Sequence, residues 1–411
     1  MATCVCPEQT LLSVLIVCLL VRSSSSSSTS SSNQTFLSAQ EMKKMKLNEE
    51  HLKKINKPPQ KTIKSPDGDI IDCVMFKHQP AFDHPLQKGD FQMEPAEIPK
   101  GYEPDGFEEE ENVQLWSLSG EKCPEGTIPI RRTTEVDLLR TNSITKLGRR
   151  NPNNGRKDSN NGHEHAVGYA GGSQYFGAKA SMNVWPPKVA NKNEFSIAQI
   201  WILAGSFGHD LNTIEAGWLV SPELYGDNFP RFFTYWTTDA YQATGCYNLL
   251  CSGFVQTSNR IALGAAISPV SSFNGRQFDI TLLIWKDPKH GHWWLRFGSG
   301  RLVGYWPSYL FSHLRSHATM VQYGGEVVNT RRSGFHTSTQ MGSGHFAGEG
   351  FGRAAYFRNL KVVDWDNNLI PSYNLKLLAD HSNCYDVRGG RNIVWGNYFY
   401  YGGPGRNVRC P

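Results

Sequence analysis

Apolar and polar residues alternate most clearly in two short stretches, and both predict β-strands. In residues 212–220 (NTIEAGWLV), every second side chain from Ile214 to Val220 is apolar, and these fall on one face because strand side chains alternate. Glu215 and Gly217 fall on the opposite face. A carboxylate in this setting is costly to bury without a partner or a task. The glycine, which has no side chain, predicts an open hollow beside it.

A second stretch, residues 319–329 (TMVQYGGEVVN), repeats this arrangement, with Glu326 on the same face as Gln322 and Gly324. A glutamate on the solvent face of a half-buried strand is the simpler interpretation of either stretch alone. The alternative is that Glu215 and Glu326 meet across one cleft and form an acid/base pair. We adopt this hypothesis because the rest of the chain favours it.

Strand-like runs continue to the C-terminus and are separated by turns such as Asn274-Gly275. The predicted strands cover residues 166–170, 174–184, 195–203, 212–220, 231–237, 261–267, 277–285, 293–297, 319–328 and 353–363. Only residues 307–314 are expected to be helical. So many short strands predict an all-β domain, folded as a large antiparallel β-sandwich that resembles a jelly roll.

The N-terminal part of the chain has a different pattern. Residues 38–57 have apolar residues near helical spacing, and Pro58-Pro59 ends the predicted helix. Residues 88–114 are acidic and proline-rich, and we expect them to lack compact structure. Together with short strands, these features predict a small α+β domain. Its strands are expected at residues 70–76, 115–119 and 127–132.

Residues 146–165 (KLGRRNPNNGRKDSNNGHEH) are basic, rich in Asn and Gly, and almost free of apolar side chains. They predict an exposed, cleavable linker, in which Arg149-Arg150 and Arg156-Lys157 are candidate processing sites. The final GHEH lacks the HExxH spacing of a metal motif, so a polar loop is the better interpretation. The predicted organisation is a signal peptide (1–25), a Ser-rich disordered segment (26–37), the small domain (38–145), the linker (146–165) and the large domain (166–411).

The N-terminal residues indicate secretion. Residues 11–21 (LLSVLIVCLLV) have the length of the apolar part of a signal peptide and are too short to span a bilayer easily. Arg22 follows this run instead of preceding it, so an uncleaved membrane anchor is the alternative. A secreted chain could be glycosylated at the sequon of Asn33. The net charge of +5 comes from scattered Lys and Arg, which does not favour nucleic-acid binding.

The cysteines agree with secretion, because six of the nine lie outside the presumed signal peptide and an even number suits disulfides. A zinc site would need a second close pair of cysteines, which the sequence lacks. There is also no P-loop, dinucleotide fingerprint or nucleophile elbow, so we expect neither a metal nor another cofactor. The spacing suggests the disulfides Cys246–Cys251 and Cys384–Cys410, which leaves Cys73 and Cys123 for each other.

Two facing carboxyl groups in a dry site cannot both ionise easily, so one of them keeps a proton. The ionised group can take a proton from water, and the protonated group can donate to a carbonyl oxygen or a leaving group. This chemistry suits peptide or glycoside hydrolysis, and the pattern does not separate the two. A non-catalytic cell-wall binding protein with an aromatic groove is a further alternative, although most such aromatics belong to a core. The tryptophans concerned are Trp218, Trp236, Trp285, Trp293, Trp294 and Trp306.

Several strings resemble the neprosin family of plant secreted proteins, and the resemblance covers essentially everything after the signal peptide. CVMFKHQPAFDHPL from Cys73 and CPEGTIPIRRT from Cys123 are similar to the activation-peptide domain of that family. Other strings, together with the last two cysteines, are similar to its catalytic domain. These strings are QIWILAG, NTIEAGWLVSPELYGD, TGCYNLLC, GFVQTSN, YGGEVVN and MGSGHFAGEGFGRAAYFRN.

The resemblance implies a glutamic endopeptidase that is made as a zymogen, has an antiparallel β-sandwich and cleaves after proline at acid pH. It places the two catalytic glutamates at Glu215 in IEAGW and Glu326 in GGEV. It also matches the disulfides Cys246–Cys251 and Cys384–Cys410.

The implied partners are a proline-containing peptide or protein substrate and the chain's own pro-domain, which would act as an inhibitor. We expect protonation of acidic pro-domain residues to weaken its contacts with the more basic catalytic domain. The implied location is extracellular, in the apoplast or cell wall. A membrane partner is expected only if the signal peptide stays uncleaved. For the substrate pocket, we expect Gln199, Trp218, Gln242 and Asn329.

Overall fold

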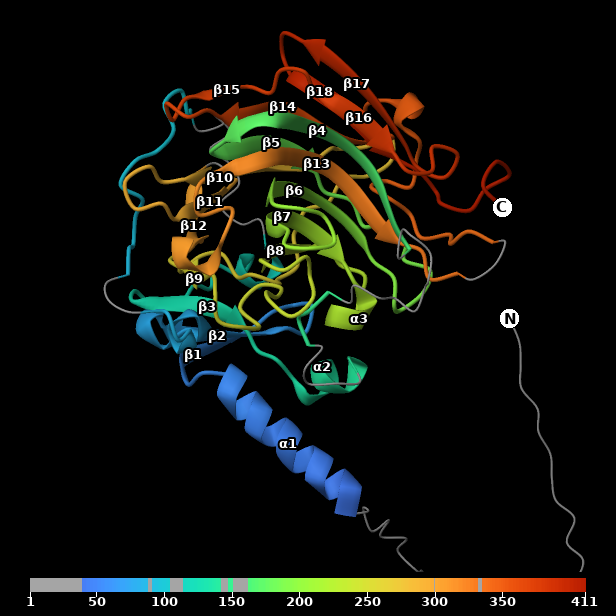
Figure 1. Cartoon of the computed structure of the whole chain (residues 1–411). Coiled ribbons are helices and arrows are strands. Elements are labelled where there is room, and N and C mark those ends of the chain that lie inside the picture. The colour runs from blue at the N-terminus through green and yellow to red at the C-terminus, as the bar shows by residue number, and fades with distance from the viewer. Residues whose placement is uncertain are drawn as a thin grey trace, which may run out of the picture. The chain divides into compact units, whose positions relative to one another are not determined.

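The computed structural model describes residues 39–87, 91–103, 114–141, 147–150, 162–298, 300–331 and 335–411 (Figure 1). The chain divides into two compact units, Met1–Lys44 and Met45–Pro411. Of the first unit, only the beginning of helix α1 (Ala39–Ile55) is described. The predicted signal peptide, the Ser-rich segment, Asn33 and most of the linker therefore lie outside the described residues. Among the helices that are described, none has the length and apolar character needed to cross a membrane.

Two antiparallel sheets form most of the second unit, and they confirm the predicted β-sandwich. The six-stranded sheet has the order β16-β4-β13-β6-β7-β8. Its strands are β4 (His163–Tyr175), β6 (Ser196–Ala204), β7 (Asn212–Val220), β8 (Arg231–Thr237), β13 (Ala318–Val328) and β16 (Lys376–Ala379).

The nine-stranded sheet has the order β17-β18-β14-β5-β10-β11-β12-β9, and β15 pairs with β14 beside this path (Figure 1). Its strands are β5 (Gly177–Asn183), β9 (Val255–Gln256), β10 (Asp279–Lys286), β11 (Trp293–Phe297), β12 (Arg301–Trp306), β14 (Ala355–Val363), β15 (Leu369–Pro371), β17 (Asp386–Asn392) and β18 (Gly396–Gly402).

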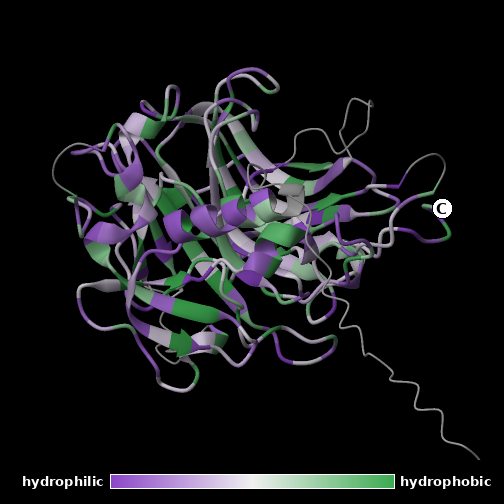
Figure 2. Cartoon of the chain, turned by 90° about the horizontal axis from the view of Figure 1, so that it is seen from below, coloured by the Kyte–Doolittle hydropathy of each residue, from purple (hydrophilic) through white to green (hydrophobic). Residues whose placement is uncertain are grey.

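The main hydrophobic core lies between these two sheets and is built by strand alternation. Ile214, Ala216 and Trp218 of β7 point into it, as predicted. All six tryptophans considered for a groove belong to this core instead, so the core interpretation is confirmed for each of them. Hydrophobic residues accordingly gather in the interior strands, whereas the peripheral loops are mainly hydrophilic (Figure 2).

The N-terminal region forms a small three-stranded sheet of β1 (Pro59–Lys64), β2 (Ile70–Met75) and β3 (Thr127–Arg131). Helix α2 (Glu135–Arg140) follows. It begins at Thr134, whose hydroxyl and backbone N–H make a reciprocal capping box with Asp137. The disulfide Cys73–Cys123 ties β2 to the loop before β3, which confirms the pairing predicted for these cysteines.

Several local predictions were wrong. Residues 115–117 form a 3-10 turn, only Ser308–Leu310 of the predicted helix is helical, and 261–267 make isolated bridges instead of a strand. Strands β12, β17 and β18 were missed. Gly304 interrupts the apolar run of β12, and β17 is mostly polar and exposed. Strand β4 begins at His163, inside the stretch expected to be linker.

Within the acidic, proline-rich stretch 88–114, residues 91–103 are more ordered than expected, because they run along the nine-stranded sheet. Residues 88–90 and 104–113 lie outside the described part of the chain. The indole N–H of Trp285 donates to the backbone oxygen of Glu97 at 2.9 Å. The backbone N–H of Gln92 donates to the hydroxyl of Tyr305 at 3.2 Å. Backbone groups thus make these contacts, so the charge of the segment did not reveal its order.

Candidate functional site

Glu215 and Glu326 lie on the same face of the six-stranded sheet, the face opposite the main core. Glu215 is in β7 and Glu326 is in β13, and β6 separates the two strands. Both carboxylates are buried, with 0% and 1% of each residue exposed. Two buried charges of the same sign are unfavourable unless a cation or a proton accompanies them.

The cation is Arg150, which lies at the end of the described linker segment 147–150. Its Nη2 is 2.9 Å from Oε2 of Glu215, and its Nη1 donates to Oε2 of Glu326 at 3.3 Å. The contact with Glu215 lacks hydrogen-bond alignment and is an ion pair only. One guanidinium therefore bridges the two carboxylates, which brings together the glutamates that the sequence singled out.

Aromatic side chains enclose this guanidinium. Its central carbon lies 5.3 to 5.8 Å from the centres of four rings, close enough for cation–π attraction. The Nε of Arg150 also donates to the hydroxyl of Tyr247 at 3.0 Å. Only 6% of the arginine side chain is exposed. The four rings belong to Phe195, Tyr235, Tyr241 and Tyr247.

The chain reaches this position through a fixed turn. Gly148 has a φ of +71°, and a Cβ there would lie 2.7 Å from Leu250, so a larger residue would clash. The backbone oxygen of Gly148 accepts from the N–H of Tyr247 at 2.7 Å. Tyr247 and Leu250 belong to the loop closed by the disulfide Cys246–Cys251, a pairing that the sequence predicted.

Glu326 is surrounded by cations and donors. His163 Nδ1 lies 2.6 Å from its Oε1, and His165 Nε2 lies 4.0 Å from its Oε2. The side-chain amide of Gln199 donates to Oε2 at 3.4 Å. Burial acts to raise the pKa of Glu326, but the charge of Arg150 and the two histidines outweigh burial and hold this pKa well below its usual range.

Glu215 has neutral partners apart from Arg150. The hydroxyls of Tyr241 and Thr213 donate to its Oε1 at 2.7 and 2.8 Å. Burial raises the pKa of Glu215, and Arg150 lowers it without cancelling the rise. The two glutamates are therefore driven apart in pKa, which is the arrangement that acid/base catalysis needs.

Of the four residues expected near the substrate, Gln199 lies beside Glu326, on the sheet face that carries both glutamates. Trp218 does not, because it lies in the main core and its indole N–H donates to the backbone oxygen of Asn183 at 3.0 Å. Asn329 donates to Glu164 at 3.1 Å and falls on the other face of β13 from Glu326. Gln242 lies in an exposed turn outside the strands.

The prediction of an open hollow beside Gly217 was also wrong. A Cβ on this glycine would lie 1.9 Å from the backbone oxygen of Ala198 in the neighbouring strand β6. The missing side chain thus lets two strand backbones approach closely and does not open a space for substrate.

A second cluster of charges lies on the other side of β4, where Glu164 accepts from His336 at 2.8 Å and His381 at 2.9 Å. These three residues have their ligand atoms close enough for a metal ion. They satisfy one another as ion pairs, and Asn329 completes the shell of Glu164, so a structural role accounts for the cluster. The nearby disulfide Cys384–Cys410, also predicted, occupies both of its sulfur atoms.

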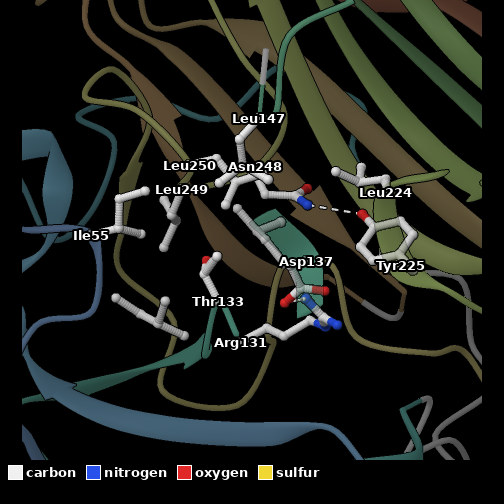
Figure 3. A pocket seen from close by; sticks show the side chains of 12 residues that line it. Ile55, Arg131, Thr133, Asp137, Leu147, Leu224, Tyr225, Asn248, Leu249 and Leu250 are labelled. Carbon is white, nitrogen blue, oxygen red and sulfur yellow. Dashed lines mark hydrogen bonds and ion pairs between the residues drawn. The ribbon is translucent and has the colours of Figure 1, made fainter. Parts of the chain in front are cut away.

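A pocket that neither glutamate lines is formed by residues of both the N-terminal region and the sandwich (Figure 3). Arg131 and Asp137 line one side of it, and Tyr225 and Asn248, which are hydrogen-bonded to each other at 3.0 Å, line the other. Leu147 also lines this pocket. The segment that carries Arg150 is thus anchored three residues before the arginine.

Sequence reasoning missed the residues that contact the two glutamates from outside their own strands. Arg150 and His163 were placed in an exposed linker, and Tyr241 was not considered. One signal was present, because HEH alternates as a strand does and continues into the apolar run AVGYA. No pattern within the chain connected Arg150 to residues that follow it by 65 and 176 positions.

Comparison with known proteins identifies the family of the chain. Residues 192–404 match the family model described as Neprosin, and residues 62–169 match the one described as Neprosin activation peptide. Among solved structures, scytalido-glutamic peptidase bound to a transition-state analogue inhibitor is similar at 12% identity and a TM-score of 0.33. The match covers 58% of this chain and 97% of that chain.

SCP-B, a member of the eqolisin family of peptidases in complex with the tripeptide Ala-Ile-His, is similar at 10% identity and a TM-score of 0.31. This match covers 59% of this chain and 98% of that one. The family assignment depends on the family models, since the Neprosin match alone spans just over half of the 411 residues. The chain belongs to the neprosin family of peptidases and carries the activation peptide of that family.

Proposed function

We propose that this protein is a secreted glutamic endopeptidase, made as a zymogen, in which Glu215 and Glu326 activate water against a peptide carbonyl in acid. The observation that carries the proposal is the single guanidinium that binds both carboxylates. Because one side chain reaches both carboxylates, they face the same enclosed space, which a substrate and a water molecule could enter once the arginine leaves. Gln199 supports the proposal, because its side-chain oxygen is buried without a hydrogen-bond partner and can accept an N–H from a substrate.

The proposed preference for cleavage after proline draws on the aromatic rings around the arginine. Tyr235, Tyr241 and Tyr247 present ring faces and hydroxyl groups to one enclosed space. A proline ring is compact and apolar and can pack against such faces. The neprosin assignment favours peptides over glycans as the substrate, although carboxylate pairs serve both reactions.

Arg150 is the proposed inhibitory element. It neutralises both carboxylates and fills the space that a substrate residue would need. As the pH falls, Glu215 is protonated first because burial raises its pKa, and its ion pair with Arg150 is then lost. Of its two carboxylate partners, Arg150 then keeps only Glu326, which two histidines also contact. Acid thus weakens the binding of Arg150 to the two glutamates before any peptide bond is cut.

A second charged contact joins the activation peptide to the catalytic region. Arg231 of β8 is fully buried and pairs with Asp69 beside β2, with Asp67 at 3.5 Å and with Asp227 at 2.6 Å. Loss of either activation-peptide carboxylate would leave a buried arginine with fewer partners. The contact therefore supports the proposal that opposite charges hold the pro-domain to the catalytic region.

The three disulfides favour an oxidising extracellular compartment. The proposed site of action is the apoplast or cell wall, where an acidic medium would keep one proton on the glutamate pair.

The test is to expose the full chain to acid at about pH 4, near the ordinary pKa of a glutamate, and then add a mixed peptide library analysed by mass spectrometry. We expect cleavage of the linker, followed by cleavage of library peptides with proline before the broken bond. Turnover of glycans without peptides would instead indicate a glycosidase. Tight binding of polysaccharide or proline-rich chains without turnover at any pH would indicate a binding protein, and either result would overturn the proposal.

A further inference from the structure

Apart from Arg150, the two glutamates have different neighbours. Histidines lie beside Glu326, whereas neutral hydroxyl groups lie beside Glu215. Around Glu326, β4 contributes two histidines, one in contact through Nδ1 at 2.6 Å and one at 4.0 Å. Around Glu215, the nearest groups are the neutral hydroxyls of Tyr241 and Thr213. The activation peptide masks this difference, because its arginine serves both carboxylates at once.

We propose that His163 and His165 are positioning residues that keep Glu326 ionised, so that Glu326 is the general base and Glu215 the general acid. This inference rests on the proposed function and deepens it. The register of the sheet carries it, because His165 lies directly opposite Glu326 in the pairing of β4 with β13. Directly opposite side chains share a face and interact. His163, two residues earlier, shares that face.

A brace holds one of the histidines toward the carboxylate. Asp380 binds the Nδ1 of His165 at 2.9 Å and also accepts from its backbone N–H at 2.9 Å. The opposite ring nitrogen, Nε2, is therefore directed at Glu326. Burial lowers the pKa of His165, but the bond to Asp380 and the charge of Glu326 outweigh burial and raise it. The imidazole thus keeps its positive charge in a mildly acidic medium.

The other charged groups near Glu326 lie on different elements and point to the same assignment. Arg150 comes from the linker segment and leaves on activation, while Glu215 of β7 is the like charge across the cleft. Departure of the arginine removes the only cation bound to Glu215 among the described residues, but leaves two histidines beside Glu326. After activation Glu326 therefore keeps neighbouring histidines, whereas Glu215 keeps no cation among the described residues.

The reaction balances with these roles. Glu326 takes a proton from water as the water oxygen bonds to the carbonyl carbon, and Glu215 gives its proton to the carbonyl oxygen. In the second step, Glu326 gives its proton to the amide nitrogen as the C–N bond breaks. Glu215 recovers a proton from a hydroxyl of the tetrahedral intermediate, so both carboxyl groups return to their starting states.

The experiment compares pH profiles of kcat/KM for acid-matured wild type, His163→Asn, His165→Asn and Tyr241→Phe, with the exposed His209→Asn as the matched control. Removing a positive charge raises the pKa of Glu326, so the acid limb of the profile should move to higher pH by about one unit in either of the first two variants. Tyr241→Phe removes a donor from Glu215, so the basic limb should move upward instead. His209→Asn should move neither limb.

If the roles of the two glutamates were exchanged, the histidine variants would move the basic limb and Tyr241→Phe would move the acid limb. If the histidines were purely structural, their substitution would lower the rate at every pH without moving either limb. Either result would overturn the inference. If a histidine variant does not fold, Asp380→Asn acts through His165 and should move the acid limb the same way by a smaller amount. An unmoved limb in that folded variant would also count against the inference.

A second readout does not need turnover. The pH dependence of the difference in unfolding free energy between the full chain and its Glu326→Gln variant reports the pKa of Glu326. Repeating this measurement in a His163→Asn background should shift the midpoint upward. A chain that shows this shift but cleaves no peptide would contradict the proposed function, while the control of Glu326 ionisation by His163 would stand.

Discussion

The two faces of the six-stranded sheet are made by the same strands but have different tasks. On one face, Ile214 and Trp218 of β7 are sealed against the nine-stranded sheet. On the other face, Glu215 from between them meets a guanidinium, a phenol and a hydroxyl. Because strand side chains alternate, one strand holds the sandwich together and also places a charged group beside Arg150 on the opposite face. If the proposed function is correct, substitutions on the two faces should separate stability from activity residue by residue.

The strongest test of this separation is Glu215→Gln in the acid-matured protein. We expect kcat to fall by about 10²- to 10⁴-fold, the usual worth of a general acid or base. We expect no loss of stability near neutral pH. Burial raises the pKa of Glu215, so its ionised form costs folding free energy above that pKa, and a neutral amide removes this cost. Peptide turnover and urea unfolding measure the two effects, and full activity would exclude Glu215 from the mechanism.

Three residues along, Trp218→Ala should give the opposite result. The lost ring leaves a cavity between the sheets, and we expect the free energy of unfolding to fall by about 3 to 5 kcal/mol. KM for the folded protein should stay close to the wild-type value. Trp218→Phe is the milder companion, since it removes mainly the hydrogen bond to Asn183. A large rise in KM in this variant would return Trp218 to the substrate site.

Gly217→Ala tests the close approach of the neighbouring strands β6 and β7, which make up part of both faces of the sheet. The added Cβ would overlap the backbone oxygen of Ala198, so we expect the strands to shift and stability to fall by about 1 to 3 kcal/mol. Thermal unfolding measures this. Gly208→Ala is a control of the same chemistry with free space around the added carbon, although its φ of +75° carries a smaller backbone cost. Equal losses in both variants would remove the role of the strand contact.

The smallest expected effect concerns Arg150, the residue that covers the two glutamates. Arg150→Gln should raise the activity of the uncut chain by roughly tenfold, equivalent to about 1.4 kcal/mol, because the charge contacts with Glu215 and Glu326 are lost while the buried Leu147 still holds the segment in place. Arg149→Gln is the matched control, as that neighbouring arginine is exposed. Mass spectrometry must confirm that the linker is intact. An inactive Arg150→Gln zymogen would show that other contacts maintain latency.

The sequence predicted the sandwich well because alternation with apolar residues is a local signal. It was readable in β7 and β13, where it also revealed Glu215 and Glu326 as exceptions to the pattern. It failed in β17, whose residues DVRGGRN are polar and mostly exposed. That strand is specified by its pairing with β18, which is information that lies outside the segment itself.

The site was only half predictable for a related reason. A charged residue in an apolar strand is conspicuous, but a basic residue in a polar linker is not, so Arg150 looked like its neighbours. Its role arises from a long-range contact that a glycine turn and a leucine anchor make possible. The prediction of Trp218 as a substrate-binding residue failed for a different reason. Its aromatic character suggested a groove, although its position on the same strand face as Ile214 already placed it in the core.

The burial of Arg150 also bears on the order of maturation events. An external protease that cuts after an arginine must draw that side chain into its own specificity pocket. Here the side chain is enclosed by four rings and two carboxylates, with 6% of it exposed. Scission at this bond must therefore follow the withdrawal of the arginine, and acidity rather than the abundance of a convertase would set the pace of maturation there.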